Sequence, residues 1–199
     1  MSIDIAPPMS PEAIEPTVKR VVAKALELDA NEIEASASLQ LDFNAQSLDM
    51  LDISFALERE FKVPFPQSDL IQRASAHIDE DLLVQKGKIT DVGLELLRTG
   101  MPEAEASRIV PGLRATDAVS LITVNTFTRL VIRLLEAKAA FPRECPKCGA
   151  ETREAESMPE FECPNCGDTR PLPSGDDVLF GDMIGVLERL GLLKDQEPK

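Results

Sequence analysis

Four cysteines place the strongest constraint on how this chain can fold. They occur in two near copies of one segment, Cys145-Pro146-Lys147-Cys148-Gly149 and Cys163-Pro164-Asn165-Cys166-Gly167. Glycine after the second cysteine of each pair allows a tight turn that presents backbone N–H groups to sulfur. Thiolates suit a soft ion in tetrahedral coordination. The pattern therefore predicts a zinc site whose ligands are Cys145, Cys148, Cys163 and Cys166.

This cysteine pattern resembles zinc ribbons. Four cysteines close the coordination shell, whereas catalytic zinc usually keeps one position open, so we expect a structural ion. Iron is the alternative metal, as in rubredoxin-like sites, and two disulfides are the other alternative, which a cytoplasmic chain disfavours. The loop between the cysteine pairs is rich in glutamate, which favours a structural or protein-docking ribbon over a nucleic-acid-binding one.

The second informative stretch, residues 41–61, leads into a predicted amphipathic helix. Ser47 lies where an N-cap or first-turn residue is expected, and Asp49 belongs to the same first turn. Acidic residues occupy the other faces of this helix. One apolar stripe at helical spacing is formed by Leu48, Leu51, Phe55 and Phe61.

This stretch resembles the modification site of acyl carrier proteins. Ser47-Leu48-Asp49 and the run from Phe55 to Phe61 match that family. Asn44 stands where glycine is usual and Gln46 where aspartate is usual; Asn44 tolerates the left-handed backbone that glycine would allow. The alternative is that Ser47 only caps the helix.

The resemblance implies a function and a set of partners. A phosphopantetheinyl transferase would attach the 4'-phosphopantetheine arm of coenzyme A to Ser47, and the arm would hold acyl groups as thioesters. The pathway would be of the fatty-acid, lipid or polyketide type. Acyl-transferring or synthase enzymes would bring basic patches to the acidic face formed by Asp49, Asp52 and Glu58. The chain would then be a carrier and not an enzyme.

The remaining pattern predicts a mainly α fold: an acyl-carrier-like four-helix bundle with a helical insertion, then a small zinc ribbon with short β-hairpins and a C-terminal helix. The resemblance covers about residues 17–66 and 120–139, where Ile122-Thr123-Val124 precedes a strongly amphipathic helix. We expect three parts: a bundle over residues 1–140 with its insertion at about 67–119, a ribbon over 141–172, and a linker with a helix over 173–199.

Helix signals also occur in the insertion and near the C-terminus. Thr90 is expected to cap a helix that ends at Gly100. Another helix is expected to begin near Pro102 and to end before Pro111-Gly112. Ser174 or Asp176 is expected to start the last helix. His77, the single histidine, has no serine or cysteine nucleophile near it in the sequence, so no catalytic role is expected.

Charge and hydropathy narrow the classes of function. A net charge of −14 and a pI of about 4.5 disfavour a nucleic-acid-binding ribbon factor and favour partners with basic surfaces. No apolar run is long enough to cross a bilayer, and the first four residues lack signal-peptide features, so a cytoplasmic location is expected. The main alternative function is an unmodified, carrier-like zinc-ribbon adaptor for protein assembly, for which Gln46 is the best support.

Overall fold

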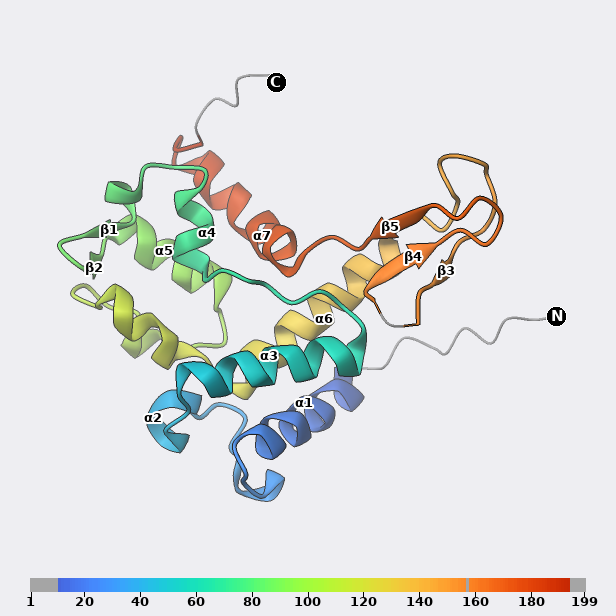
Figure 1. The fold of residues 1–199 in the computed structure, drawn as a ribbon. Coiled ribbons are helices and arrows are strands. Elements are labelled where there is room, and N and C mark those ends of the chain that lie inside the picture. Colours follow the sequence, from blue (N-terminus) through green and yellow to red (C-terminus); the bar gives the residue numbers. More distant parts are fainter. Residues whose placement is uncertain (1–10, 157, 194–199) are drawn as a thin grey trace.

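The computed structural model describes residues 11–156 and 158–193, and it confirms the predicted mainly helical fold with a small strand-containing region around the cysteines (Figure 1). The α-helices are α1 (Pro11–Ala25), α2 (Leu39–Phe43), α3 (Ser47–Phe61), α4 (Leu70–Ser75), α5 (Asp91–Gly100), α6 (Val124–Ala140) and α7 (Gly175–Arg189). Short 3-10 turns lie at Ala30–Glu32, Glu80–Leu82, Ala106–Arg108 and Ala115–Leu121. The strands are β1 (Val84–Gln85), β2 (Lys88–Ile89), β3 (Arg153–Glu154), β4 (Glu160–Glu162) and β5 (Thr169–Pro171).

Helices α1, α3 and α6 form the carrier-like part of the molecule. Helix α1 packs against both α3 and α6, and the apolar residues between them form one buried cluster. Thr123, in the segment that resembles the start of the last carrier helix, caps α6, with its side chain accepting from the Thr126 N–H at 3.2 Å. The buried members of this cluster include Ile14, Val18, Val22, Ile33, Leu39, Ala45, Ile53, Leu57, Phe61, Val63, Phe65, Phe127, Val131 and Leu134.

The predicted apolar stripe of α3 is wrong for most of its members. Ile53, Leu57 and Phe61 form the buried side of the helix, whereas Leu48, Leu51 and Phe55 are about half or more exposed. Two apolar stripes at helical spacing run along this helix, and they face opposite ways. The buried stripe also includes the partly buried Met50, and it continues past the helix into Val63 and Phe65.

The insertion has an apolar core of its own. Helices α4, α5 and α7 pack together, and the leucines of the predicted insertion helix, Leu94 and Leu97, are buried there with Leu83, whereas Leu82 is 39% exposed. Thr90 caps α5 and the helix ends at Gly100, as predicted. The helix expected from Pro102 is wrong: only a 3-10 turn forms there, at Ala106–Arg108.

Helix α7 ties the end of the chain to the segment that follows α3. Its first turn approaches Pro66 so closely that a Cβ atom on Gly175 would overlap the backbone there. The buried carboxylate of Asp176 accepts from the Ser68 hydroxyl at 2.6 Å and from the backbone N–H groups of Gln67 and Ser68. Ser174 caps the helix, as expected, and Asp177 pairs with Arg73 of α4 at 2.6 Å.

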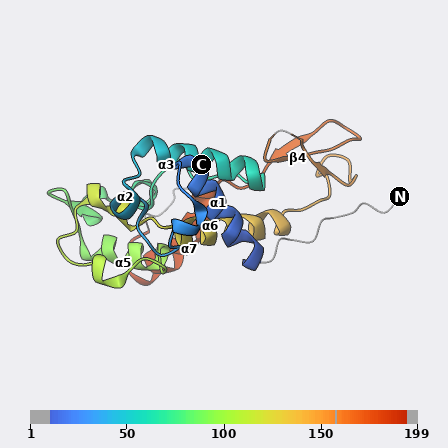
Figure 2. The same ribbon diagram turned by 90° about the horizontal axis from the view of Figure 1, so that it is seen from below.

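The cysteine segments form turns next to the strands of a separate small sheet, which lies between α6 and α7 in the chain. Strands β3, β4 and β5 pair antiparallel in that order, with Phe161 of β4 opposite Glu154 and Arg170. Figure 2 places this sheet and α2 at opposite ends of the molecule, as does Figure 1. None of the described helices combines the length and the apolar character that crossing a membrane requires.

Candidate functional site

Ser47 is the first residue of α3 and its side chain is exposed. Asn44 ends α2 in the left-handed conformation, with φ of 55°, which confirms that asparagine can replace glycine in this turn. Ala45 is buried and anchors the turn on the carrier core. The Gln46 backbone N–H donates to the Asp49 carboxylate at 2.7 Å. The turn therefore holds Ser47 at the solvent-facing N-terminus of a long helix.

The two residues that depart from the usual carrier pattern contact one another. The Gln46 side-chain amide donates to the backbone oxygen of Asn44 at 2.8 Å and lies 3.3 Å from the Asn44 side-chain oxygen. This contact satisfies the amide within the turn. Gln46 consequently stabilises the loop before Ser47 but places no negative charge there.

The three acids proposed for partner docking lie in different surroundings. Asp49 accepts from the Gln46 N–H, and the half-buried Glu58 accepts from the Phe65 N–H at 2.9 Å. Asp52 is exposed. Two of these carboxylates therefore take part in the local structure of α3, and only Asp52 projects freely into solvent.

The structure brings the four cysteine thiols together. Their sulfur atoms lie within 4.8 Å of one another, with Cys145 to Cys166 at 3.6 Å and Cys148 to Cys163 at 3.5 Å. A tetrahedral ion with bonds of about 2.3 Å to sulfur requires neighbouring sulfurs to be about 3.8 Å apart. A disulfide requires about 2.05 Å. The spacing fits four ligands of one metal ion and does not fit two disulfides.

The backbone around the cysteines is built in duplicate. Cys145 donates its N–H to Ala150 and accepts from Gly149, and Cys163 makes the same pair of bonds with Asp168 and Gly167 at equal lengths of 2.8 and 2.9 Å. The two glycines have φ of 72° and 73°, a conformation that disfavours other residues. The glycine requirement predicted from the Cys-Pro-x-Cys-Gly pattern is thus met in both turns.

Hydrogen bonds to the thiols make their protonation unequal. Donors from the Asn165 side chain and the Ala150 N–H lower the pKa of Cys148 to about 6. The Asp168 N–H lowers the pKa of Cys166, but burial and the neighbouring thiols outweigh it and raise that pKa to about 12. Metal binding must displace the proton from such a thiol, so the affinity of the site should fall in acid.

The ribbon is fixed to the end of α6 by aromatic stacking. Phe141, which follows α6, stacks on the buried Phe161 with ring centroids 5.4 Å apart. The guanidinium of Arg143 lies 4.0 Å from the Phe161 ring centroid, and that of Arg170 lies 4.9 Å from the Phe141 centroid. These contacts pack the ribbon against the segment that follows α6.

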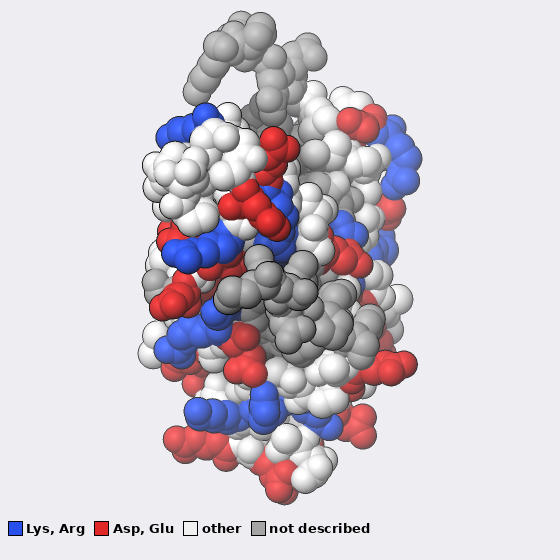
Figure 3. Space-filling model, turned by 90° about the vertical axis from the view of Figure 1, so that its right-hand side faces the viewer, with Lys and Arg blue, Asp and Glu red and all other residues white. Residues whose placement is uncertain are grey.

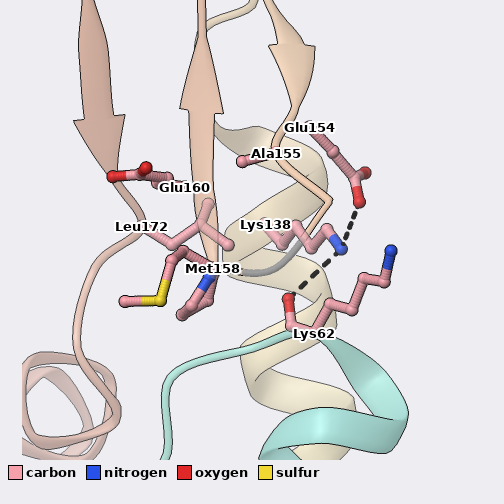
Figure 4. A pocket seen from close by; sticks show the side chains of 8 residues that line it. Lys62, Lys138, Glu154, Ala155, Met158, Glu160 and Leu172 are labelled. Atoms are coloured by element: carbon pink, nitrogen blue, oxygen red, sulfur yellow. Dashed lines mark hydrogen bonds and ion pairs between the residues drawn. The ribbon is translucent and has the colours of Figure 1, made fainter.

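A shallow hollow, with no room for an enclosed water molecule, lies where the ribbon meets the carrier helices (Figure 4). Lys138 of α6 crosses it and pairs with Glu154 of β3 at 2.7 Å, while its ammonium also donates to the Lys62 carbonyl at 3.3 Å. The hollow is lined by these charged groups and by Met158 and Leu172, so it is a junction between two parts of the fold and lies at the far end of α3 from Ser47.

Charges on the ribbon end of the molecule are mixed. Figure 3, which views this end, shows basic and acidic side chains interspersed over its described part. Lys147 pairs with Asp168 at 2.6 Å and Arg153 with Glu162 at 2.8 Å. Nucleic-acid-binding surfaces concentrate one sign of charge, which this face does not.

His77 stacks on Phe180 of α7, with ring centroids 3.8 Å apart. Burial, and then the nearby charge of Arg73, lower the pKa of His77. The histidine therefore acts as a packing residue between α4 and α7.

Sequence reasoning missed the exposed apolar side of α3. A signal was available, because Met50, Ile53, Leu57 and Phe61 form a second stripe at helical spacing that runs on into Val63 and Phe65. The longer of the two stripes is the buried one.

Comparison with known proteins agrees with the Ser47 geometry. The family model described as "Phosphopantetheine attachment site" matches residues 16–76, which include Ser47 and exclude the ribbon. An acyl carrier protein of Bdellovibrio bacteriovorus is 33% identical over 76 residues, covering 38% of this chain and 97% of that protein. Those of Helicobacter hepaticus and Campylobacter jejuni subsp. doylei are 38% and 40% identical, over 27% and 26% of this chain and 70% and 68% of those proteins. No solved structure matches the chain. The chain therefore belongs to the acyl carrier protein family.

Proposed function

We propose that this protein carries acyl intermediates as thioesters on a 4'-phosphopantetheine arm attached to the Ser47 hydroxyl. The observation that carries the proposal is the exposed Ser47 at the first position of α3, held by a turn that is anchored in the carrier core. A phosphodiester at this position would lie beside the free N–H groups and the positive end of the helix dipole. A phosphopantetheinyl transferase would install the arm, and acyl-transferring or synthase enzymes of a fatty-acid, lipid or polyketide-type pathway would use it, in the cytoplasm.

The experiment that tests this role is loading of the purified protein. Incubation with coenzyme A and a broad-specificity phosphopantetheinyl transferase should add one phosphopantetheine mass to the native chain and none to Ser47→Ala. Gln46 is the N-cap residue of α3 and the Ser47 side chain is exposed, so the variant should lose no more than about 0.5 kcal/mol and remain folded. A mass gain that persists in Ser47→Ala would place the modification on another residue.

We propose that Cys145, Cys148, Cys163 and Cys166 hold one structural zinc ion. The four sulfurs supply a complete tetrahedral donor set, which supports a structural role over a catalytic one. The ribbon has few buried apolar residues of its own, and the metal would supply folding energy that this small core lacks. Iron is the competing ion, and elemental analysis of the purified protein distinguishes the two.

A second candidate function is an unmodified adaptor that uses the insertion and the ribbon for protein assembly. The neutral Gln46 favours it, because its side chain is bound to Asn44 and presents no charge beside Ser47. The loading experiment separates the candidates: an adaptor stays at its unmodified mass under conditions that load other carriers.

A further inference from the structure

Strand β1 forms one edge of the small sheet in the insertion, at the margin of the molecule away from the ribbon (Figure 1). Its inner side pairs with β2, and β2 pairs in turn with the chain at Arg114. The Thr90 N–H donates to the Leu83 carbonyl. Because antiparallel bonding alternates along a strand, the Val84 N–H and carbonyl then point to the outer side of β1. Neither group has a hydrogen-bond partner among the residues that the structure describes, so β1 is an unpaired edge.

Nothing on β1 itself blocks pairing with another strand. Exposed edges are commonly protected by a charged residue, a proline or a bulge on the edge strand. β1 consists of Val84 and Gln85 in regular register with β2, and it has none of these. Leu82, just before the strand, is a large apolar side chain that is 39% exposed. The edge is thus open to a second strand.

Cations without partners lie at one end of this sheet and on its exposed side. Lys86, in the turn between β1 and β2, and Lys88, on β2, form what we call the basic tip. Lys88 lies directly opposite Arg114. All three side chains are exposed, and none forms an ion pair within the described residues. Like charges directly opposite one another destabilise a sheet, so this arrangement favours the approach of an acidic group.

Acidic residues without partners lie just before β1. Asp79, Glu80 and Asp81 are exposed, and none pairs with a cation in the part of the chain that the structure describes; we call them the acidic turn. The order along the chain is thus the acidic turn, the unpaired edge and the basic tip. When two such edges pair antiparallel about a two-fold axis, the acidic turn of each copy lies beside the basic tip of the other. The surface is therefore complementary in charge to a second copy of itself.

We propose that this protein forms a two-fold dimer in which the β1 strands of two copies pair antiparallel and the acidic turn of each copy contacts the basic tip of the other. The Val84 residues of the two copies exchange their N–H and carbonyl hydrogen bonds at the axis. Because β1 is two residues long, the association is weak and depends on the charge contacts. At about 0.15 M salt the Debye length is about 8 Å, which screens the net charge of −14 that each copy carries.

Sedimentation equilibrium in about 150 mM sodium chloride, from about 10 to about 500 μM protein, tests the dimer. The mass should rise with concentration from 21.8 kDa toward twice that value. Lys86→Glu with Lys88→Glu should weaken the association by at least about tenfold, as should Glu80→Lys with Asp81→Lys, because each change sets like charges against one another. An equimolar mixture of these two double variants should associate within about threefold of the native protein, since every tip then meets a turn of opposite charge.

The matched control is Lys19→Glu with Lys24→Glu on α1, which changes the net charge as much as the double variant of the basic tip and should associate like the native protein. A native protein that stays at 21.8 kDa at the highest concentration would overturn the proposal. A mixture of double variants that stays monomeric, although each variant has the native circular dichroism spectrum, would also overturn it. Association that survives in either double variant alone would place the interface elsewhere.

Hydrogen exchange tests the strand pairing separately from the charges. The Val84 amide should exchange more slowly at high protein concentration than at low concentration, because the second copy accepts its hydrogen bond. Unchanged exchange in a protein that does associate would overturn the pairing through β1.

Discussion

The turn before Ser47 and the two cysteine turns each contain a residue with positive φ. They differ in how much apolar surface is buried around them. Asn44 has φ of 55°, and Gly149 and Gly167 have φ of 72° and 73°. The turn before Ser47 is flanked by Leu39, Ala45 and Ile53, which belong to the large buried cluster between α1, α3 and α6. The ribbon buries few side chains, with Phe161 at its centre. The comparison indicates that the carrier end has enough apolar burial to fold without a metal, whereas we expect the ribbon to need the proposed zinc ion.

The largest expected effect is on the ribbon. Replacing two ligands, as in Cys163→Ser with Cys166→Ser, should reduce bound metal from one ion per chain to none and unfold the β3–β5 sheet, because the ion supplies much of its folding energy. Elemental analysis measures the ion, and amide NMR signals report the sheet. Signals from α1, α3 and α6 should persist. Unchanged metal content in the double variant would contradict the site.

A pair of substitutions on α3 tests which of its sides is buried. Ile53→Ala should cost about 2–5 kcal/mol of unfolding free energy, because Ile53 is fully buried and leaves a cavity. Leu51→Ala, two residues away and half exposed, should cost no more than about 0.5 kcal/mol. Urea unfolding followed by circular dichroism measures both. Equal losses would mean that the helix is rotated from the orientation described here.

The attachment of α7 to the carrier end is tested at Gly175. Gly175→Ala should lower the unfolding free energy by about 1–3 kcal/mol, because the added methyl group meets the backbone at Pro66, which cannot move aside freely. Gly185→Ala in the same helix is the control: its Cβ meets no atom within 4 Å, and alanine favours helix by about 1 kcal/mol. A stable Gly175→Ala protein would show that α7 is not held against Pro66.

The smallest expected effect depends on pH. The Ser174 hydroxyl first, and then the Ser174 N–H and Arg73, lower the pKa of Asp177 from its ordinary value of 3.8. The charged form therefore stabilises the folded state above pH 3.8, and this contribution disappears as the pH falls through the lowered pKa. Asp177→Asn should cost no more than about 0.5 kcal/mol at neutral pH, since the side chain is largely exposed. Unfolding free energies at pH 7 and in acid should show the difference vanishing in acid.

Local signals in the sequence located most elements, but not which way they face. The caps at Thr90 and Ser174 and the glycine-bearing cysteine turns were predictable because each depends on a few adjacent residues. The exposed side of α3 was missed because two apolar stripes have the same spacing, and only packing against α1 and α6 selects between them.

Contacts between segments far apart in the chain are even harder to predict from the sequence. The sequence predicts an amphipathic last helix, but nothing in its pattern indicates that Met183, Val186 and Leu187 complete the core of an insertion about a hundred residues earlier in the chain. The hydrogen bond from Ser68 to Asp176 likewise joins residues far apart in the chain, and no local sequence pattern indicates it. The boundaries expected at residues 140 and 172 stay predictions.

The central claim is that Ser47 bears the arm, and intact mass spectrometry of the protein purified from its native host tests it most directly. The account predicts one added 4'-phosphopantetheine, with or without an acyl group, and fragmentation that places it on the Ser47 peptide. A chain found entirely at its unmodified mass, which then also fails to load with coenzyme A and a transferase, would contradict the carrier function and favour the adaptor.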